Sequence, residues 1–320
     1  MKENEKPSLF QFATKELSQD AFFCWLLSWA DEKYKDTDLF RIAKVFLKEI
    51  LGKEISVNDI YIKRQYKKID FFVRLNGELT IVFEDKTGTE MHDNQLKRYK
   101  EIITEKYPND KLFFVYIKND LVFKEEIKEA EKFGYKVIDI NKLFDILDNF
   151  QPKNDIYNDY YFYMRGKRDK YINFEKIEYS KLSQEGWSSF IYHYVKYYEY
   201  NKMWEKRESW CKIKKIDIGK SCLELQIKHG ENANGNYGKL AIYLVFNNDN
   251  LKKKEDINNR LIKLFKDKKI KIKVNNRKKA KKWTEMISFI DFPKIDLGYF
   301  DCIINKKYIE KIVNIMNDFK

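Results

Sequence analysis

Three charged side chains occur at a spacing that suits metal-assisted hydrolysis of a phosphodiester bond. Asp70 lies in the apolar segment Lys68-Ile-Asp-Phe-Phe-Val73, and Glu84 and Lys86 end a second one, Ile81-Val-Phe-Glu-Asp-Lys86. Hydrolysis needs an oriented water, neutralisation of charge at phosphorus and help for the leaving oxygen. One or two Mg²⁺ ions held by carboxylate oxygens supply all three. Both carboxylates are therefore candidate metal ligands, and the lysine is a candidate catalytic group.

A β-hairpin would bring these side chains together. Apolar alternation predicts two strands, residues 60–75 and 78–86, joined by Asn76-Gly77, which is a strong hairpin signal. Side chains two residues apart on a strand share a face, so Glu84 and Lys86 point to the same side.

The loop length decides whether Asp70 joins them. A two-residue loop pairs Leu75 with Glu78, which turns Asp70 away from the face of Glu84. A three-residue loop that pairs Arg74 with Glu78, with glycine in the left-handed conformation, brings both carboxylates to one side, as does a β-bulge. We therefore predict a three-residue loop or a bulge.

The order aspartate, hairpin, Glu-x-Lys and helix resembles the PD-(D/E)XK nuclease superfamily. Gln95-Leu-Lys-Arg-Tyr99, on the helix expected next, is similar to the Gln-x-x-x-Tyr signature of its RecB-like branch. Glu16 lies on the first expected helix, where that family often supplies another acidic group. The resemblance covers about the first 150 residues, and Ile69 stands where the family name has proline.

The resemblance implies a metal site. Asp70 and Glu84 would bind Mg²⁺ together with the backbone carbonyl of Asp85, and Mn²⁺ would be able to substitute. Glu16 would bind a metal directly or through water, although a surface charge at a helix N-terminus explains it equally well. Asp85 is a rival side-chain ligand, but strand alternation with Lys86 favours Glu84.

The resemblance also implies roles for the neighbouring residues. Lys86 would orient the attacking water or help to deprotonate it, and would stabilise developing charge. Gln95 and Tyr99, one helical turn apart, would brace the site or touch the DNA backbone; Tyr99 also fits a helix residue packed on the core. His92 would approach a phosphate.

Composition restricts the class of protein. A chain of 320 residues with 43% hydrophobic and 35% charged residues, 11 Gly and 4 Pro is typical of a soluble globular protein. The longest apolar run, residues 21–30, is too short to span a bilayer, and the N-terminal residues contain no signal-like stretch, so we expect a cytoplasmic protein without a membrane partner. Four dispersed Cys and three His build no zinc site; we expect buried, reduced cysteines.

The positive charge is concentrated in one stretch. Residues 251–282 contain 15 Lys and Arg and three Asp and Glu, so they carry +12 of the chain's net +13. Such a local field suits nucleic acid, and we expect DNA. The alternative is a solvated lysine-rich surface. The residues that we expect to contact the phosphates are Lys268, Lys269, Lys271, Lys273, Arg277, Lys278 and Lys279.

The expected fold is α/β: a restriction-endonuclease-like mixed sheet flanked by helices in residues 1–150, then an α+β domain in residues 160–320 that binds the substrate. In the first half, we expect helices from Thr14 or Lys15, at 38–51 ending at Gly52, at 93–106, 123–133 and 141–149, and strands at 111–118 and 136–140. In the second half, we expect helices at 184–204, 256–265 and 278–289, and strands at 212–218, 222–228, 240–246 and 269–274, with a glycine-containing loop between 228 and 240. The aromatic residues of 184–204 are expected to pack in the core.

The sequence thus predicts a metal-dependent nuclease that hydrolyses phosphodiester bonds of DNA, in phage defence, restriction or repair. One alternative is a catalytically silent nucleic-acid-binding protein on the same fold. Another is a protein-interaction component, which the Tyr- and Trp-rich C-terminal half also suits. A protein partner or a homodimer stays open.

Overall fold

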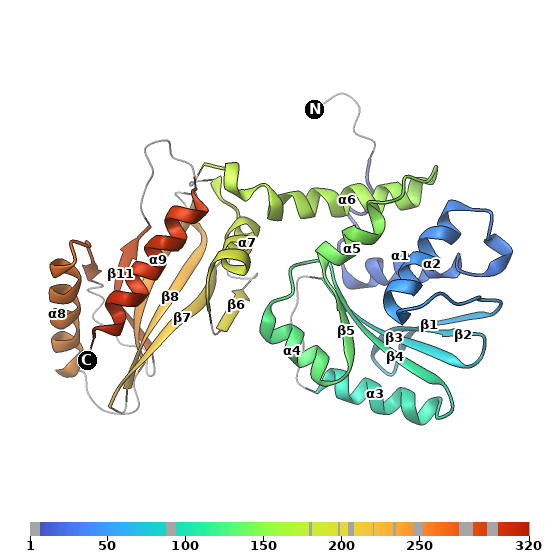
Figure 1. Cartoon of the computed structure of the whole chain (residues 1–320), viewed down its shortest axis with the longest axis horizontal. Coiled ribbons are helices and arrows are strands. Elements are labelled where there is room, and N and C mark those ends of the chain that lie inside the picture. Colours follow the sequence, from blue (N-terminus) through green and yellow to red (C-terminus); the bar gives the residue numbers. More distant parts are fainter. Residues whose placement is uncertain are drawn as a thin grey trace. The chain divides into compact units, whose positions relative to one another are not determined.

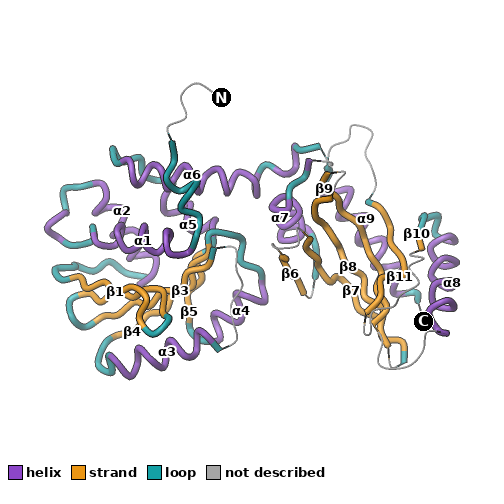
Figure 2. Tube along the Cα trace, turned by 180° about the vertical axis from the view of Figure 1, so that it is seen from behind, coloured by secondary structure: helices purple, strands orange, loops and turns teal. Residues whose placement is uncertain are grey.

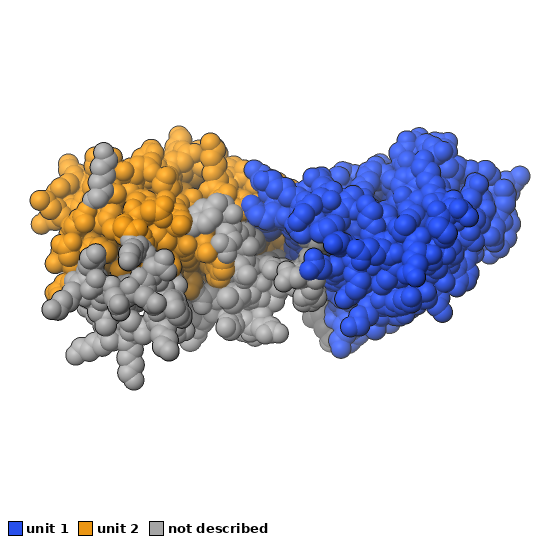
Figure 3. Space-filling model, turned by 90° about the horizontal axis from the view of Figure 1, so that it is seen from below, with its two compact units in different colours: residues 1–169 blue, residues 170–320 orange. Residues whose placement is uncertain are grey.

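The computed structural model describes residues 7–87, 94–178, 181–197, 199–203, 208–219, 221–232, 235–245, 252–274, 284–292 and 300–319. The chain forms two compact units, residues 1–169 and 170–320 (Figure 3). Helix α6 (Asp155–Ile172) begins inside the expected boundary between residues 150 and 160, and unit 1 extends to residue 169. Its buried Tyr160 stacks on Phe22 with ring centroids 3.7 Å apart, which ties this helix to unit 1.

Unit 1 is an α/β structure built on one mixed sheet with the strand order β1-β2-β3-β4-β5 (Figure 1). The first three strands are antiparallel, and β4 and β5 run parallel to β3. The strands are β1 (Ile60–Tyr66), β2 (Ile69–Leu75), β3 (Leu79–Lys86), β4 (Lys111–Lys118) and β5 (Tyr135–Ile138).

Helices cover both faces of this sheet (Figure 1). One group comprises α1 (Glu16–Ser28), α2 (Asp38–Leu51) and α5 (Ile140–Leu147). The other comprises α3 (Gln95–Lys106) and α4 (Lys124–Lys132). Helix α2 ends as predicted at Gly52, which has a left-handed φ of 71°.

The prediction of one strand over residues 60–75 was wrong. The chain reverses at Lys67 and Lys68, whose φ angles of 49° and 71° are left-handed, so the segment forms the β1–β2 hairpin. Lysine seldom adopts this conformation. A pair of lysines is therefore not recognised as a turn in the sequence.

Unit 2 is built on a six-stranded antiparallel sheet in the order β10-β11-β9-β8-β7-β6 (Figure 2). The strands are β6 (Glu199–Met203), β7 (Glu208–Ile218), β8 (Ser221–Asn232), β9 (Gly235–Val245), β10 (Lys273–Val274) and β11 (Thr284–Asp291). The helices are α7 (Gln184–Tyr194), α8 (Lys252–Asp267) and α9 (Cys302–Asn317). Trp187 of α7 is buried and stacks on His229 of β8, and Phe190 is also buried, which confirms the expected packing role for these two aromatic residues.

Four predictions for unit 2 were wrong. Of the strand expected at 269–274, only Lys273–Val274 is a strand, β10. The expected glycine-containing loop is a continuous β8–β9 hairpin, paired as far as Asn232 and Gly235. The helix expected at 278–289 is β11 where it is described, because residues 284–291 pair with β9 over a long sequence distance. The expected long helix from 184 ends at Tyr194, and β6 follows.

A glycine lies directly against the Trp187 ring. A Cβ atom on Gly238 of β9 would come within 2.0 Å of Cζ2 of Trp187, so the ring and the strand would have to separate. We expect Gly238→Ala to destabilise the protein by about 1–3 kcal/mol, measured by guanidinium unfolding. Gly166→Ala is the control, because Gly166 of α6 has no atom within 4 Å of its Cβ position and should gain up to ~1 kcal/mol. Equal stability of Gly238→Ala and wild type would contradict this packing.

All four cysteines are buried and free of disulfides, as predicted. No helix in the described ranges has the length and apolar character to cross a bilayer.

Candidate active site

The β2–β3 hairpin sets the two candidate carboxylates on one face of the sheet. The loop is residues 76–78, the first two of which have φ of 51° and 69°, and Leu75 pairs with Leu79. Counting along this ladder puts Asp70 opposite Glu84. The predicted three-residue loop is confirmed, although it begins one residue later than expected. Asparagine and glycine fit here because both tolerate a positive φ.

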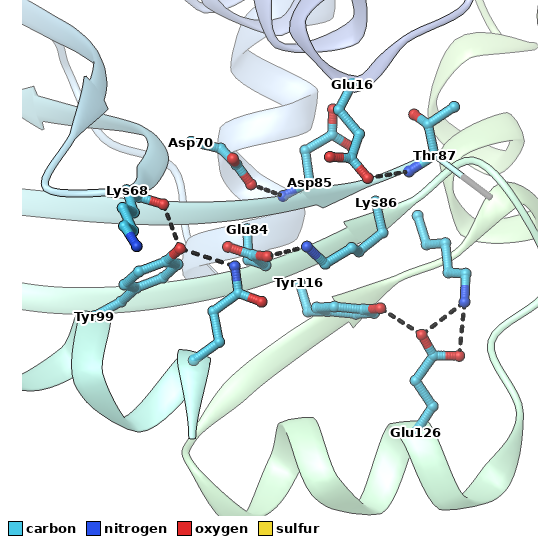
Figure 4. Close-up of polar contacts among 12 residues, drawn as sticks. Glu16, Lys68, Asp70, Glu84, Asp85, Lys86, Thr87, Tyr99, Tyr116 and Glu126 are labelled. Carbon is cyan, nitrogen blue, oxygen red and sulfur yellow. Dashed lines mark hydrogen bonds and ion pairs between the residues drawn. The ribbon is translucent and has the colours of Figure 1, made fainter. Parts of the chain in front are cut away.

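The side chains of Asp70, Glu84 and Lys86 lie together at the end of this hairpin (Figure 4). Oδ2 of Asp70 accepts a hydrogen bond of 2.8 Å from the backbone N–H of Asp85. Nζ of Lys86 lies 2.5 Å from Oε1 of Glu84, and the two side chains are 5% and 0% exposed. The carboxyl group of Glu84 and the ammonium of Lys86 therefore pair with each other out of contact with water.

Burial and the neighbouring charges shift the pKa values of all three groups. Burial, and then the charge of Asp70, raise the pKa of Glu84 from 4.5 to about 8. Burial also raises the pKa of Asp70. For Lys86, burial is the largest influence and alone would lower the pKa, but the charge and hydrogen bond of Glu84, together with the charges of Glu16 and Asp70, raise it overall. Lys86 is thus an ammonium near neutral pH, which suits orienting a water and stabilising negative charge rather than accepting a proton.

The residues present fit a hard divalent cation. Within the described ranges, Oε2 of Glu84 is buried and no hydrogen-bond donor reaches it. The described residues contain no preformed cluster of three or more His, Cys, Asp and Glu side chains for a metal. Mg²⁺ does not require one, since it is commonly held by one or two carboxylates and keeps several waters. Asp70, Glu84 and the backbone carbonyl of Asp85 are the groups that would hold it.

The side chain of Asp85 points to the opposite face. Nε2 of Gln19, on α1, donates to Oδ1 of Asp85 at 2.5 Å, and the fully buried Asp20 lies beside them. Burial, then the charge of Asp20, raise the pKa of Asp85 well above its usual value. Only the backbone of Asp85 is therefore placed to join Glu84, as strand alternation indicated.

Glu16 lies at the end of β3. Its Oε1 accepts a hydrogen bond of 3.2 Å from the backbone N–H of Thr87, the residue after Lys86 (Figure 4). The structure thus brings a third acidic side chain, from α1, to the strand end that carries Glu84 and Lys86.

The Gln-x-x-x-Tyr pair braces β2. Nε2 of Gln95 donates to the hydroxyl oxygen of Tyr99 at 2.8 Å, and the Tyr99 hydroxyl donates to the carbonyl oxygen of Lys68, two residues before Asp70 (Figure 4). Tyr99 is only 1% exposed. Of the two roles expected for it, bracing fits and contact with the DNA backbone does not. His92 lies outside the described residues.

Sequence reasoning missed a buried polar network behind the site. Nδ2 of Asn119, just after β4, donates to Oε1 of Gln19 at 2.7 Å and to Oγ1 of Thr87 at 3.2 Å. Its Oδ1 accepts from Nζ of Lys167 on α6 at 2.5 Å. The position of Gln19, three residues after Glu16 and on the same side of a helix, was the signal available.

The expected phosphate-binding lysines are partly described. Lys268, Lys269, Lys271 and Lys273 are exposed and lie after α8. Nζ of Lys268 is 3.6 Å from Asp318, and Lys273 pairs with Asp291. Arg277, Lys278 and Lys279 lie outside the described residues.

Comparison of the chain with models of known families, with curated proteins and with solved structures finds no match. A functional assignment therefore depends on the geometry and chemistry of these residues.

Proposed function

We propose that the chain is a metal-dependent nuclease that hydrolyses DNA, and that unit 1 has a restriction-endonuclease-like fold. One observation carries the proposal: the three-residue loop sets Asp70 opposite Glu84, with Lys86 on the same face. That arrangement supplies two carboxylates for a cation and an ammonium for the attacked phosphate at one point on the sheet.

Each residue of the candidate active site has a separate role in the proposed reaction. Asp70 and Glu84 would hold a Mg²⁺ ion, which would supply charge neutralisation at the phosphate and activation of a water. The Asp85 N–H fixes the orientation of Asp70. Lys86, whose pKa is raised by the acidic groups around it, orients the water as an ammonium and stabilises the charge that develops on the phosphoryl oxygens. Tyr99 holds the start of β2 in place.

The direct test is cleavage of circular and linear DNA, single- and double-stranded, with Mg²⁺, Mn²⁺ or EDTA. We expect cutting that requires a metal and stops in EDTA, and nicked circles would identify an endonuclease. Salt-sensitive binding without cutting of any substrate in either metal would replace the proposal by a catalytically silent nucleic-acid-binding protein.

The proposal includes a role for the lysines that follow α8 in holding the substrate. We expect the triple variant of Lys268, Lys269 and Lys271 to Gln to weaken DNA binding. The slope of log K against log salt should fall by about one for each phosphate that the protein no longer neutralises, measured by fluorescence anisotropy in EDTA.

A control triple variant removes the same charge from unit 1 by changing the exposed Lys35, Lys48 and Lys53 to Gln. It should bind DNA with the wild-type salt slope. If both triple variants reduce the slope equally, binding follows net charge, and these lysines form only a solvated surface.

A further inference from the structure

A second lysine lies beside Lys86 on the same face of the sheet. Strands β3 and β4 are parallel neighbours, with Glu84 paired to Tyr116 and Lys86 to Lys118. Neighbouring strands are about 4.8 Å apart, and side chains two residues apart on a strand share a face. The four side chains therefore form a compact group at the carboxyl end of both strands.

Lys118 is held in a fixed position by Glu126 of α4. Its Nζ lies 2.7 Å from Oε1 and 2.9 Å from Oε2 of that carboxylate, and the two side chains are 8% and 14% exposed. The Tyr116 hydroxyl donates to the same carboxylate (Figure 4). An ammonium has three donors, and Glu126 accepts two of them. One donor is left for a further acceptor.

Packing alone gives little reason for this arrangement. Like charges at paired positions on adjacent strands repel, and an ion pair out of water costs several kcal/mol in desolvation before its attraction is counted. Replacing a buried ion pair by well-packed apolar side chains of similar volume often leaves the fold equally stable or more stable. A second buried lysine next to Lys86 is therefore better explained by an anionic ligand.

We propose that Lys118 is a second phosphate-binding residue, which contacts a DNA phosphate beside the one held at Asp70, Glu84 and Lys86. This inference rests on the proposed nuclease function and deepens it. Glu126 and Tyr116 act as positioning residues that keep the Lys118 ammonium at the strand end. Lys118 then fixes the register of the DNA backbone, while the chemistry proceeds at the neighbouring phosphate.

The test separates a phosphate contact from an internal bridge. The double variant Lys118→Gln/Glu126→Gln leaves net charge unchanged, and the new amide oxygen at position 126 still accepts from Tyr116. Binding of a short fluorescein-labelled DNA, single-stranded and duplex, is measured in EDTA between about 50 and 200 mM salt. We expect the salt slope to fall by about 0.7 for the single strand and about 0.9 for the duplex.

The matched control makes the same two substitutions at the opposite end of these strands. Lys111 begins β4 and Glu78 precedes β3, and both are exposed. Lys111→Gln/Glu78→Gln should keep the wild-type slope. Unfolding of both variants is followed in parallel, and a structural bridge would change stability without changing the slope.

The outcomes are distinct from those of the nuclease assay. A reduced slope in the Lys118 double variant supports the proposal, even if the wild type cleaves nothing and the nuclease function falls. A wild-type slope in that variant overturns it, even if the wild type cleaves DNA with Mg²⁺. The proposal is overturned as well if the wild type shows no salt-dependent binding.

Discussion

Glu84→Gln will reduce metal-dependent DNA cleavage by at least about 10³-fold, a loss of about 4 kcal/mol in transition-state stabilisation. The substitution preserves shape but removes the carboxylate that would hold the cation and that contributes to the raised pKa of Lys86. We expect the same of Asp70→Asn, which also weakens the acceptor for the Asp85 N–H. Cleavage is measured at saturating Mg²⁺, and DNA binding in EDTA should persist.

Glu78→Gln is the matched control, because Glu78 ends the loop of the same hairpin and is exposed. It should cleave at the wild-type rate. The assignment of the site fails if Glu84→Gln and Asp70→Asn both cleave as fast as this control.

Glu84→Gln will also stabilise the metal-free protein at high pH. The pKa of Glu84 is raised in the folded protein from 4.5 to about 8, so folding opposes its ionisation. Its protonated form is favoured in the fold, and stability is progressively lost as the pH rises from about 4.5 through about 8. Glu84→Gln has no such titration. We expect its melting temperature to exceed that of the wild type by several degrees at pH 8.5 in EDTA, but hardly at all at pH 5.

Mg²⁺ provides the complementary measurement. Since binding stabilises only the folded state and requires the ionised carboxylate, added Mg²⁺ should raise the wild-type melting temperature more at pH 8.5 than at pH 6. Glu84→Gln should not respond. A melting temperature of the variant that follows the wild type at every pH, with and without Mg²⁺, would contradict both the burial and the metal role of Glu84.

The parts of the site that follow a short-range rule were predictable from the sequence. Strand alternation placed Glu84 and Lys86 on one face, and the requirement that Asp70 join them led to the three-residue loop. Helix spacing linked Gln95 and Tyr99. Each of these inferences needs only the local geometry of one hairpin or one helix.

The parts that depend on contacts between distant segments were not predictable. Gln19 and Asn119 meet across a hundred residues, and β11 is a strand because β9 lies beside it. In the sequence, Lys118 only ends a buried strand, and it is the pairing of β3 with β4 that places it beside Lys86. Contacts between distant segments determine these positions, and the local periodicity of the sequence does not reveal such contacts.

The buried network of Gln19, Asp85 and Asn119 has an evolutionary consequence. Gln19 uses its donor on Asp85 and its acceptor on Asn119, and Asn119 uses its acceptor on the half-buried Lys167, so a change at one position leaves an unsatisfied polar group at another. Substitutions at these three positions should therefore occur together during evolution. In an alignment of relatives these three columns should covary, and a sequence that loses one of the polar residues should have lost the others.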